Sequence, residues 1–385
     1  MNKLNSIFGQ ILQIISRSDF KKAVNEHESE KHSKGFSSWT HFSAMLYAQL
    51  SGQDGLRGVE NAIASQRNLH YHLGIKTVKR STLAYANEHR SHEVFKATFE
   101  TLLNKVMAKT KKHKFRFKND LYSIDASTID LCLGLYDWAK FRKTKGGIKL
   151  HVKLNHSGYI PQYVNVSNAD YHEVNELPKM GLKKGDVVTI DRGYTDYTKY
   201  ANFCSEGIYF VTRMRKNARF KVVSRGDVSK YPNISSDQTI KFTIFYSKKK
   251  CTYCLRRIRI KDPETNKYIV LLTNQMDWAP TTVGKVYKDR WQIEIFFKTM
   301  KQKLKIKTFL GTSKNAIMIQ IWTAMIAYLL MTYMLLLSRF KWTVNSLMNV
   351  VPSLLFTRKC LWEWINYPHG SPPHNRVTAK QMELL

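Results

Sequence analysis

Two aspartates occupy positions where an acidic side chain is costly unless it has a function. Asp125 lies inside an otherwise apolar and β-branched segment, and Asp191 ends another such segment just before Arg192-Gly193, where the chain must turn. Glu294 follows in a helical pattern. One such aspartate alone is more often a turn or edge residue. Three convergent carboxylates in a basic protein suit magnesium ions and phosphodiester chemistry.

Glu294 shares its helical pattern with other groups that can bind phosphate. Tyr287, Arg290, Glu294 and Lys301 follow one another at spacings of three, four and seven residues. At about 100° per residue, these spacings place the side chains within a sector of roughly 60° on one helix. Arginine suits a bidentate phosphate contact, lysine adds a point charge, and tyrosine can donate a hydrogen bond or stack. A solvated face with an Arg–Glu pair explains any two of these residues better than all four.

The segments around these carboxylates resemble the signatures of one family. The string Y-K-D-R-W-Q-I-E-I-F-F-K-T-M-K is similar to the Tyr-Arg-Glu-Lys signature of the insertion-sequence "IS four" family of DDE transposases, with every spacing matched. Y-S-I-D-A-S-T and T-I-D-R-G-Y resemble that family's first and second Asp segments. The resemblance covers about residues 120 to 340. S-T-L-A-Y-A-N-E-H-R looks similar to the small DNA-binding domain found ahead of the core in some members.

The resemblance implies a reaction and the parts that perform it. Inverted terminal repeats are bound, the element end is nicked by hydrolysis, and the freed 3′ hydroxyl attacks the opposite strand before a homodimeric synaptic complex inserts the element into target DNA. Two Mg²⁺ ions, for which Mn²⁺ can substitute, would activate the attacking oxygen and stabilise the departing one. The implied catalytic metal ligands are Asp125, Asp191 and Glu294, and the implied phosphate contacts are Tyr287, Arg290 and Lys301.

Further DNA contacts are expected beside that signature. A flipped terminal base stacked on tryptophan is a theme of the family, and stacking can offset the few kcal/mol that flipping costs. Trp291 and Trp278 are both candidates, and Lys298 is also expected to contact DNA.

Two other acidic positions need to be weighed. His172-Glu173 lies where relatives often carry a His-acidic pair near the metals, but the preceding Asn168-Ala169-Asp170 equally indicates a capped helix start. Asp130 is the main rival of Asp125 for the first ligand. Five residues along a regular strand would put Asp130 on the opposite face, so we prefer Asp125.

The elements that position the aspartates are predicted to be strands. Three β-rich segments, a helical stretch near Glu173 to Leu182 and two more strands follow one another, which indicates an α/β fold with a mixed sheet in the order of the ribonuclease H-like folds. The five segments are residues 121–131, 148–154, 160–166, 186–191 and 208–214. Residues 219–280 contain β-rich segments only and are predicted to form an all-β insertion.

The amino-terminal part of the chain is predicted to be helical. Ser37-Ser38 can cap a helix that Gly52 stops, Gly74 marks a break, and Ser81 is an expected N-cap. These helices with basic residues around them could form a helix-turn-helix, although helical pairs with basic faces are common without DNA contact. The basic run 109–120 is expected to be a linker that could also follow a phosphate backbone.

These patterns together predict the domain organisation. We expect a helical N-terminal DNA-binding domain at 1–118 and a ribonuclease H-like catalytic core at 119–218 and 281–345. The β-rich insertion at 219–280 and a C-terminal segment at 346–385 complete the chain, whose tail beyond Pro368 is predicted to be unstructured.

The composition favours an intracellular partner of nucleic acid. There are 62 Lys and Arg against 29 Asp and Glu, a formal net charge of +33, with 43% hydrophobic residues and five cysteines. Such a charge favours a polyanionic partner, and an odd cysteine number without a signal peptide indicates a reducing compartment. A bacterial cytoplasmic, nucleoid-associated protein is expected.

Cys251 and Cys254 form one C-x-x-C without a second pair at zinc spacing, so two ordinary strand residues are the preferred interpretation.

Residues 315–338 carry no charge and are long enough to cross a bilayer. Polar residues within the run and the absence of a second span favour a helix buried on all sides instead.

Three rival hypotheses remain beside the transposase: a ribonuclease H-like nuclease without strand transfer, a domesticated DNA-binding protein without catalysis, and a membrane protein built on residues 315–338.

Overall fold

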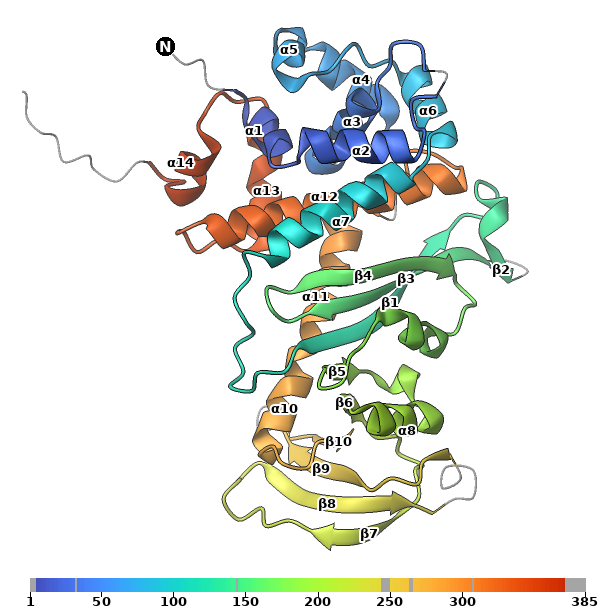
Figure 1. Cartoon of the computed structure of the whole chain (residues 1–385), viewed down its shortest axis with the longest axis vertical. Coiled ribbons are helices and arrows are strands. Elements are labelled where there is room, and N and C mark those ends of the chain that lie inside the picture. Colours follow the sequence, from blue (N-terminus) through green and yellow to red (C-terminus); the bar gives the residue numbers. More distant parts are fainter. Residues whose placement is uncertain are drawn as a thin grey trace, which may run out of the picture. The chain divides into compact units, whose positions relative to one another are not determined.

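The computed structural model describes residues 5–31, 33–142, 145–243, 250–262, 266–306 and 308–370. The chain forms two compact units (Figure 1). We call residues 1–110 with 299–385 the helical unit, and residues 111–298 the sheet unit. The tail that we expect to be unstructured beyond Pro368 lies, from residue 371 on, outside the described residues.

The helical unit contains the expected amino-terminal helices. Ser37 accepts a hydrogen bond from the Thr40 amide at the start of one of them, and Gly52 ends it at φ 67°, so both sequence predictions are confirmed. The break at Gly74 is also confirmed, with φ 64°. Ser81 was expected as an N-cap, but it lies inside a helix that begins at Arg80. The bounds are α1 Ile7–Gln13, α2 Arg17–Glu26, α3 Ser38–Ser51, α4 Leu56–Ala64, α5 His70–Leu73, α6 Arg80–His89, α7 Glu93–Met107, α12 Lys314–Leu337, α13 Val344–Leu354 and α14 Leu361–Asn366.

The long apolar run forms α12, the core helix of the helical unit. Among the described residues it is the one helix long and apolar enough to cross a membrane, and 89% of its most apolar window is buried inside the protein. It packs along α7 (Figure 1) and also contacts α3, α6 and α13. Thr323 and Thr332 donate their hydroxyl protons to carbonyls one turn earlier, which satisfies them inside the helix. The interpretation as a helix buried on all sides is confirmed.

The sheet unit is built on a mixed sheet with the expected topology. Neighbouring strands follow the order β4-β3-β1-β5-β6, with antiparallel pairing among the first three and parallel pairing among the last three. Three meandering strands followed by strands reached through helical connections are the ribonuclease H-like arrangement that the sequence predicts. The bounds are β1 Leu121–Leu131, β2 Lys140–Arg142, β3 Lys145–Asn155, β4 Ile160–Asn168, β5 Val187–Ile190 and β6 Tyr209–Arg213.

The β-rich stretch before the signature helix extends this sheet. β10 pairs antiparallel with β6, and β9, β8 and β7 follow in turn. The described part of residues 219–280 thus continues the hydrogen-bonded ladder of the core instead of forming a separate sheet. The bounds are β7 Phe220–Arg225, β8 Ile234–Phe242, β9 Leu255–Lys261 and β10 Tyr268–Thr273.

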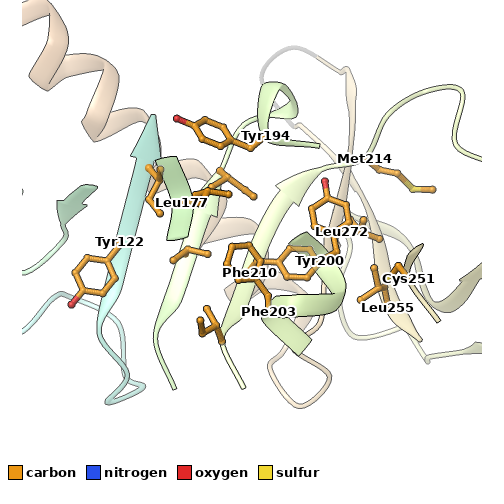
Figure 2. Packing of buried hydrophobic residues seen from close by; sticks show 14 of the residues in the cluster. Tyr122, Leu177, Tyr194, Tyr200, Phe203, Phe210, Met214, Cys251, Leu255 and Leu272 are labelled. Carbon is orange, nitrogen blue, oxygen red and sulfur yellow. The ribbon is translucent and has the colours of Figure 1, made fainter. Parts of the chain in front are cut away.

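Helices cover both faces of the sheet. α8, Tyr197–Glu206, packs with a cluster that includes Tyr122, Ile124 and Phe210 (Figure 2). α10, Pro280–Asp289, packs with a second cluster on the other face that includes Leu121 and Val211. Because side chains alternate along a strand, residues 121, 123 and 125 of β1 share the face that α10 covers. Four 3₁₀ helices, Arg67–Leu69, Asp137–Ala139, Glu173–Met180 and Arg192–Tyr194, and the helix α11, Trp291–Gln302, complete the list of elements in the described residues.

The boundary between the two units falls within α11, between Lys298 and Thr299. Residues 299–345, which we expected to belong to the catalytic core, are grouped with the amino-terminal helices. The hydrophobic pattern of α12 indicates burial but does not indicate which helices surround it.

Candidate active site

Asp125 lies on β1 at the face covered by α10. The Ala126 amide donates a hydrogen bond to Oδ1 of Asp125 at 2.8 Å. Burial above all, and then the nearby carboxylates of Asp191 and Glu173, raise the pKa of Asp125 to about 7, although the hydrogen bond from Ala126 and the charge of Arg290 oppose the shift. Burial and the neighbouring carboxylates thus disfavour the ionised form of Asp125, and a bound cation would stabilise that form.

Asp191 follows β5 and begins a short 3₁₀ turn. Its Oδ1 accepts a hydrogen bond from the Gly193 amide at 2.7 Å. A Cβ added at Gly193 would lie 3.0 Å from Oδ1 of Asp191 and 3.3 Å from Oε2 of Glu173. The glycine thus lets both carboxylates approach the same stretch of backbone.

Arg290 joins the first aspartate to the signature glutamate. Its Nη1 lies 3.5 Å from Oδ2 of Asp125, and its Nη2 donates to Oε1 of Glu294 at 2.5 Å. Asp125 is contributed by β1 and Glu294 by α11, so one guanidinium bridges two of the three elements. Burial opposes the charge of Arg290, but Tyr287 and the two carboxylates together raise its pKa.

The single helix that the signature spacing predicts is broken. α10 ends at Asp289 and α11 begins at Trp291. Between them, the Arg290 amide bonds to the Tyr287 carbonyl and the Ile293 amide to the Arg290 carbonyl, both with the tighter three-residue spacing. The assumption of 100° per residue therefore does not hold through Arg290. Tyr287 still remains close, with its ring centroid 5.7 Å from the Arg290 guanidinium carbon.

The two candidate tryptophans have different surroundings. Trp291 is 59% exposed at the start of α11. Trp278 stacks on Phe117 with ring centroids 4.1 Å apart and packs against the cluster under α10. Trp291 is thus the one with a ring face open to a ligand.

The remaining expected residues lie in several places. Lys298 is exposed on α11, and Lys301 lies in the last turn of the same helix, past the unit boundary. Glu173 is half-buried and pairs with Lys149 at 3.3 Å, whereas His172 is exposed ahead of the 3₁₀ helix. Asp130 is exposed on the face of β1 opposite Asp125.

Tyr194 is a further residue at this site that the sequence did not single out. Its side chain is fully buried, and its hydroxyl lacks a hydrogen-bond partner among the described residues. Figure 2 shows the ring at the edge of the hydrophobic cluster with the hydroxyl directed away from it. Burial, followed by the charges of Asp125, Glu173 and Asp191, raises the pKa of Tyr194. The segment T-I-D-R-G-Y contains this tyrosine, so the signal was its place three residues after the second aspartate.

The donor set fits hard divalent cations. Asp125, Asp191, Glu173 and Glu294 supply only oxygen ligands, which Mg²⁺ and Mn²⁺ prefer. The orphaned hydroxyl of Tyr194 is a polar atom that a bound water or oxyanion could satisfy. In the described part of the chain, no group of three His, Cys, Asp or Glu side chains is arranged to hold an ion. Two of the proposed carboxylates instead pair with Arg290. The five cysteines are free thiols. Cys251 and Cys254 were expected as strand residues, which is wrong, because both precede β9, which begins at Leu255.

Comparisons with known proteins point to one family. The family model described as "Transposase DDE domain" matches residues 116–330, and one described as a domain of unknown function (DUF4372) matches residues 3–76. The chain is 29% identical over 306 residues to y4zB of Sinorhizobium fredii, which is named as a transposase, covering 78% of this chain and 84% of the relative. It is 24% identical over 262 residues to a Geobacillus stearothermophilus protein named as a transposase for the insertion sequence element IS5377, covering 68% of each.

A solved structure is also similar over most of the chain. It is a cryo-EM structure of a piggyBac transposase synaptic complex with hairpin DNA, with a TM-score of 0.47 and 10% identity, covering 98% of this chain and 83% of that one. The family model, in contrast, matches more than half of the chain and includes all three carboxylates discussed above. The chain therefore belongs to the transposase DDE domain family.

Proposed function

We propose that this chain is an insertion-sequence transposase that binds terminal inverted repeats and carries out cut-and-paste transposition. The observation that carries the proposal is the bridge from Asp125 through Arg290 to Glu294, with Asp191 close enough to raise the pKa of Asp125. The bridge supports a single site made by Asp125, Asp191 and Glu294, which come from three separate segments of the sheet unit.

The carboxylates are proposed to hold divalent metal ions. Asp125, Asp191 and Glu294 are the ligands, with Mg²⁺ as the expected ion, Mn²⁺ as a substitute and two ions per site. Such ions would supply an activated attacking oxygen and charge stabilisation for the leaving oxygen. Glu173 and Tyr194 lie beside the ligands and are proposed to contact them or their waters.

The cationic and aromatic groups are proposed to hold the DNA end. When the carboxylates bind cations, Arg290 is free to offer its planar fork to a phosphate, which a lysine could contact only as a point charge. Tyr287 lies beside that fork and can add a hydrogen bond. Trp291 is proposed to stack a flipped base because its ring is exposed. Lys298 and Lys301 are proposed to contact the backbone of the same DNA.

The rest of the chain is assigned to recognition. A formal charge of +33 suits binding of both repeat and target DNA. Residues 1–118 are proposed as the DNA-binding domain. The chemistry is assigned to residues 119–218 and 281–298, the part of the predicted catalytic core that lies in the sheet unit, together with the insertion at 219–280. Residues 346–385 are kept as the C-terminal segment. A homodimer in the synaptic complex, acting at the nucleoid in a bacterial cytoplasm, completes the proposal.

The decisive experiment is cleavage and joining of labelled DNA that carries the flanking terminal repeats, with Mg²⁺ or Mn²⁺. Wild type is compared with Glu294→Gln, which keeps the shape of the side chain and removes its charge. Glu206→Gln is the matched control, because Glu206 is an exposed carboxylate at the end of α8 in the same unit. We expect repeat-specific cutting and joining that Glu294→Gln loses and Glu206→Gln retains.

Other outcomes would favour the rival functions. Cutting of any DNA without joining would indicate a ribonuclease H-like nuclease. Repeat binding by wild type without cutting under either metal would indicate a domesticated DNA-binding protein. Cutting by Glu294→Gln at the wild-type rate would remove Glu294 from the proposed ligands.

A further inference from the structure

A chain of buried hydrogen bonds runs beneath the candidate active site. Oγ of Ser123 lies 2.8 Å from Oγ1 of Thr189 and 2.7 Å from Nε2 of His156. Nδ1 of His156 lies 2.7 Å from Oδ2 of Asp289. Four side chains from separate segments are thus linked in series within the sheet unit.

The serine, histidine and aspartate have the connectivity of a nucleophilic triad, but their burial excludes that role. Ser123 is 0% exposed, His156 is 2% exposed and Asp289 is 6% exposed. A nucleophile must reach its substrate, and a fully buried hydroxyl that already bonds to two neighbours cannot. The chain of bonds must therefore act on the protein itself.

At one end of the chain, Thr189 and Ser123 each lie two residues before a proposed metal ligand. Ser123 precedes Asp125 by two residues in β1, and Thr189 precedes Asp191 by two residues at the end of β5. Because side chains alternate along a strand, each hydroxyl shares a sheet face with the carboxylate that follows it. The two segments repeat one pattern, Ser-Ile-Asp and Thr-Ile-Asp.

The other end, Asp289, lies at the break between the two signature helices. Asp289 is the last residue of α10 and directly precedes Arg290. Its carboxylate also accepts a hydrogen bond from Nζ of Lys114 at 2.6 Å and one from the Tyr159 hydroxyl at 3.3 Å. Burial opposes its ionisation, but the bonds from His156 and Lys114 lower the pKa of Asp289. Asp289 is thus ionised and accepts hydrogen bonds from three side chains at the position directly before Arg290.

The direction of the hydrogen bonds follows from the acceptor at that end. An ionised carboxylate only accepts, so Nδ1 of His156 donates its proton to Asp289. Burial lowers the pKa of His156, which keeps the ring neutral and leaves Nε2 as an acceptor for the Ser123 hydroxyl. The His156 amide also donates to the Leu121 carbonyl at 2.9 Å, which ties the residue to the start of β1.

We infer that the buried chain of Thr189, Ser123, His156 and Asp289 positions the two strand carboxylates and Arg290 relative to one another. It links β1, β5 and the junction of α10 and α11 through side chains, where the backbone ladder joins only the two strands. These are positioning residues that act through Asp125, Asp191 and Arg290. The inference rests on the proposed function of that site.

Three variants separate the hydrogen bond from the bulk of the side chains. Asp289→Asn keeps an acceptor for His156, whereas Asp289→Leu has a similar size and none. His156→Phe keeps a ring and removes both nitrogens. Asp237→Leu is the matched control, because Asp237 is a buried carboxylate of the same unit paired with Arg256 and outside the chain of bonds. All variants are studied as full-length protein below their unfolding transitions.

Two readouts are compared for each variant. The first is the rate of repeat cleavage at saturating DNA, and the second is Mn²⁺ binding to the DNA-free protein by electron paramagnetic resonance. Loss of groups that orient metal ligands typically costs 10- to 100-fold in metal affinity or activity, so roughly that loss is expected in both readouts for Asp289→Leu and His156→Phe. Asp289→Asn and Asp237→Leu are expected to stay within about threefold of wild type in both readouts, a margin well below that range. The affinity for repeat DNA is expected to stay within the same margin in every variant.

The outcomes decide the inference independently of the proposed function. Wild-type cleavage and Mn²⁺ affinity in Asp289→Leu would overturn the positioning role, as would equal losses in Asp289→Asn and Asp289→Leu. If wild type binds Mn²⁺ but cleaves no repeat DNA, the proposed function fails. The Mn²⁺ affinities of the variants would then still support or overturn the positioning role.

Discussion

The guanidinium of Arg290 lies 3.5 Å from the carboxylate of Asp125, within the space where a metal ligand would be expected to meet its ion. The same guanidinium bonds to Glu294. Arginine thus pairs with both carboxylates, and in the proposed function a bound cation would displace it from at least one of them. The planar guanidinium would then turn from a carboxylate to a phosphate, which has a similar geometry.

Arg290→Lys is therefore expected to impair cleavage although it preserves the charge. A lysine contacts one oxygen at a time and cannot bridge Asp125 and Glu294 as a fork does. Misplacement of a reacting group by about 1 Å can cost on the order of 10²-fold in rate, and a loss of this order is expected at saturating repeat DNA. The measurement is a single-turnover cleavage assay with Mg²⁺. A wild-type rate for Arg290→Lys would mean that a single charged contact suffices.

Asp125→Asn is expected to stabilise the metal-free protein while abolishing cleavage. Burial raises the pKa of Asp125 to about 7 from an ordinary value of 3.8, so the folded state resists its ionisation. This cost is absent below the ordinary pKa, grows as the pH rises from 3.8 toward 7, and is fully present above it. At about 1.4 kcal/mol per pKa unit, the amide should raise the free energy of unfolding at pH 8 by roughly 2–4 kcal/mol.

Urea unfolding of the full-length protein in EDTA checks this expectation, with pH 4 as the internal control, where the two proteins should differ by less than about 1 kcal/mol. Added Mn²⁺ should stabilise wild type and leave Asp125→Asn unchanged, because only wild type offers the charged ligand. A variant that is less stable than wild type at pH 8 would contradict the expected cost of the buried carboxylate.

Substitution of Trp291 is expected to weaken DNA binding, whereas substitution of Trp278 is expected to lower the stability of the protein. Trp291→Ala removes an exposed ring and should leave the unfolding free energy within about 0.5 kcal/mol, but it should weaken stacking of a terminal base by about 1–3 kcal/mol. Trp278→Ala removes a ring stacked on Phe117 and should cost about 1–3 kcal/mol of stability.

The measurement uses a repeat end with 2-aminopurine at its terminal nucleotide, whose fluorescence changes when the base leaves the DNA stack. The fluorescence change on binding is compared between wild type and each tryptophan variant. Loss of the fluorescence change in Trp278→Ala alone, measured while the protein is folded, would transfer the stacking role to that residue.

The sequence was sufficient to predict the strands and the segments that carry the three carboxylates. Asp125 and Asp191 interrupt or end strongly apolar strands, and the period of two along a strand already separates Asp125 from Asp130. The order of strands and helical segments gave the mixed sheet, because few topologies are compatible with short right-handed connections.

Features that depend on contacts between distant residues were not accessible in that way. The helix break at Arg290 has the same hydrophobic periodicity as a continuous helix, and only the three-residue hydrogen bonds distinguish the two. The exposure of Trp291 and the partial burial of Trp278 depend on the strands and aromatic residues packed around them. The network through His156 joins residues that lie far apart in sequence, although the repeated hydroxyl-Ile-Asp pattern was a readable sign of it.

His41 is expected to make the helical unit sensitive to acid. The ring is buried, and its Nε2 lies 2.7 Å from Oδ1 of Asn87. Burial, with a smaller effect of the Arg90 charge, lowers the pKa of His41 to about 4 from an ordinary value of 6.5. The folded state therefore favours the neutral ring. Its stabilising contribution is complete above pH 6.5 and is lost as the pH falls toward 4, by about 3 kcal/mol at 1.4 kcal/mol per unit.

Hydrogen exchange of the α3 amides between pH 7 and 4, corrected for intrinsic exchange rates, measures this loss within the helical unit alone. His41→Gln keeps a hydrogen-bonding side chain but does not titrate. Between pH 7 and 4 its opening free energy should therefore fall by about 3 kcal/mol less than that of wild type. His72→Gln replaces an exposed histidine of the same unit and is expected to behave as wild type. Equal pH dependence in wild type and His41→Gln would mean that His41 does not cause the acid sensitivity, because the only group changed between them is the buried ring.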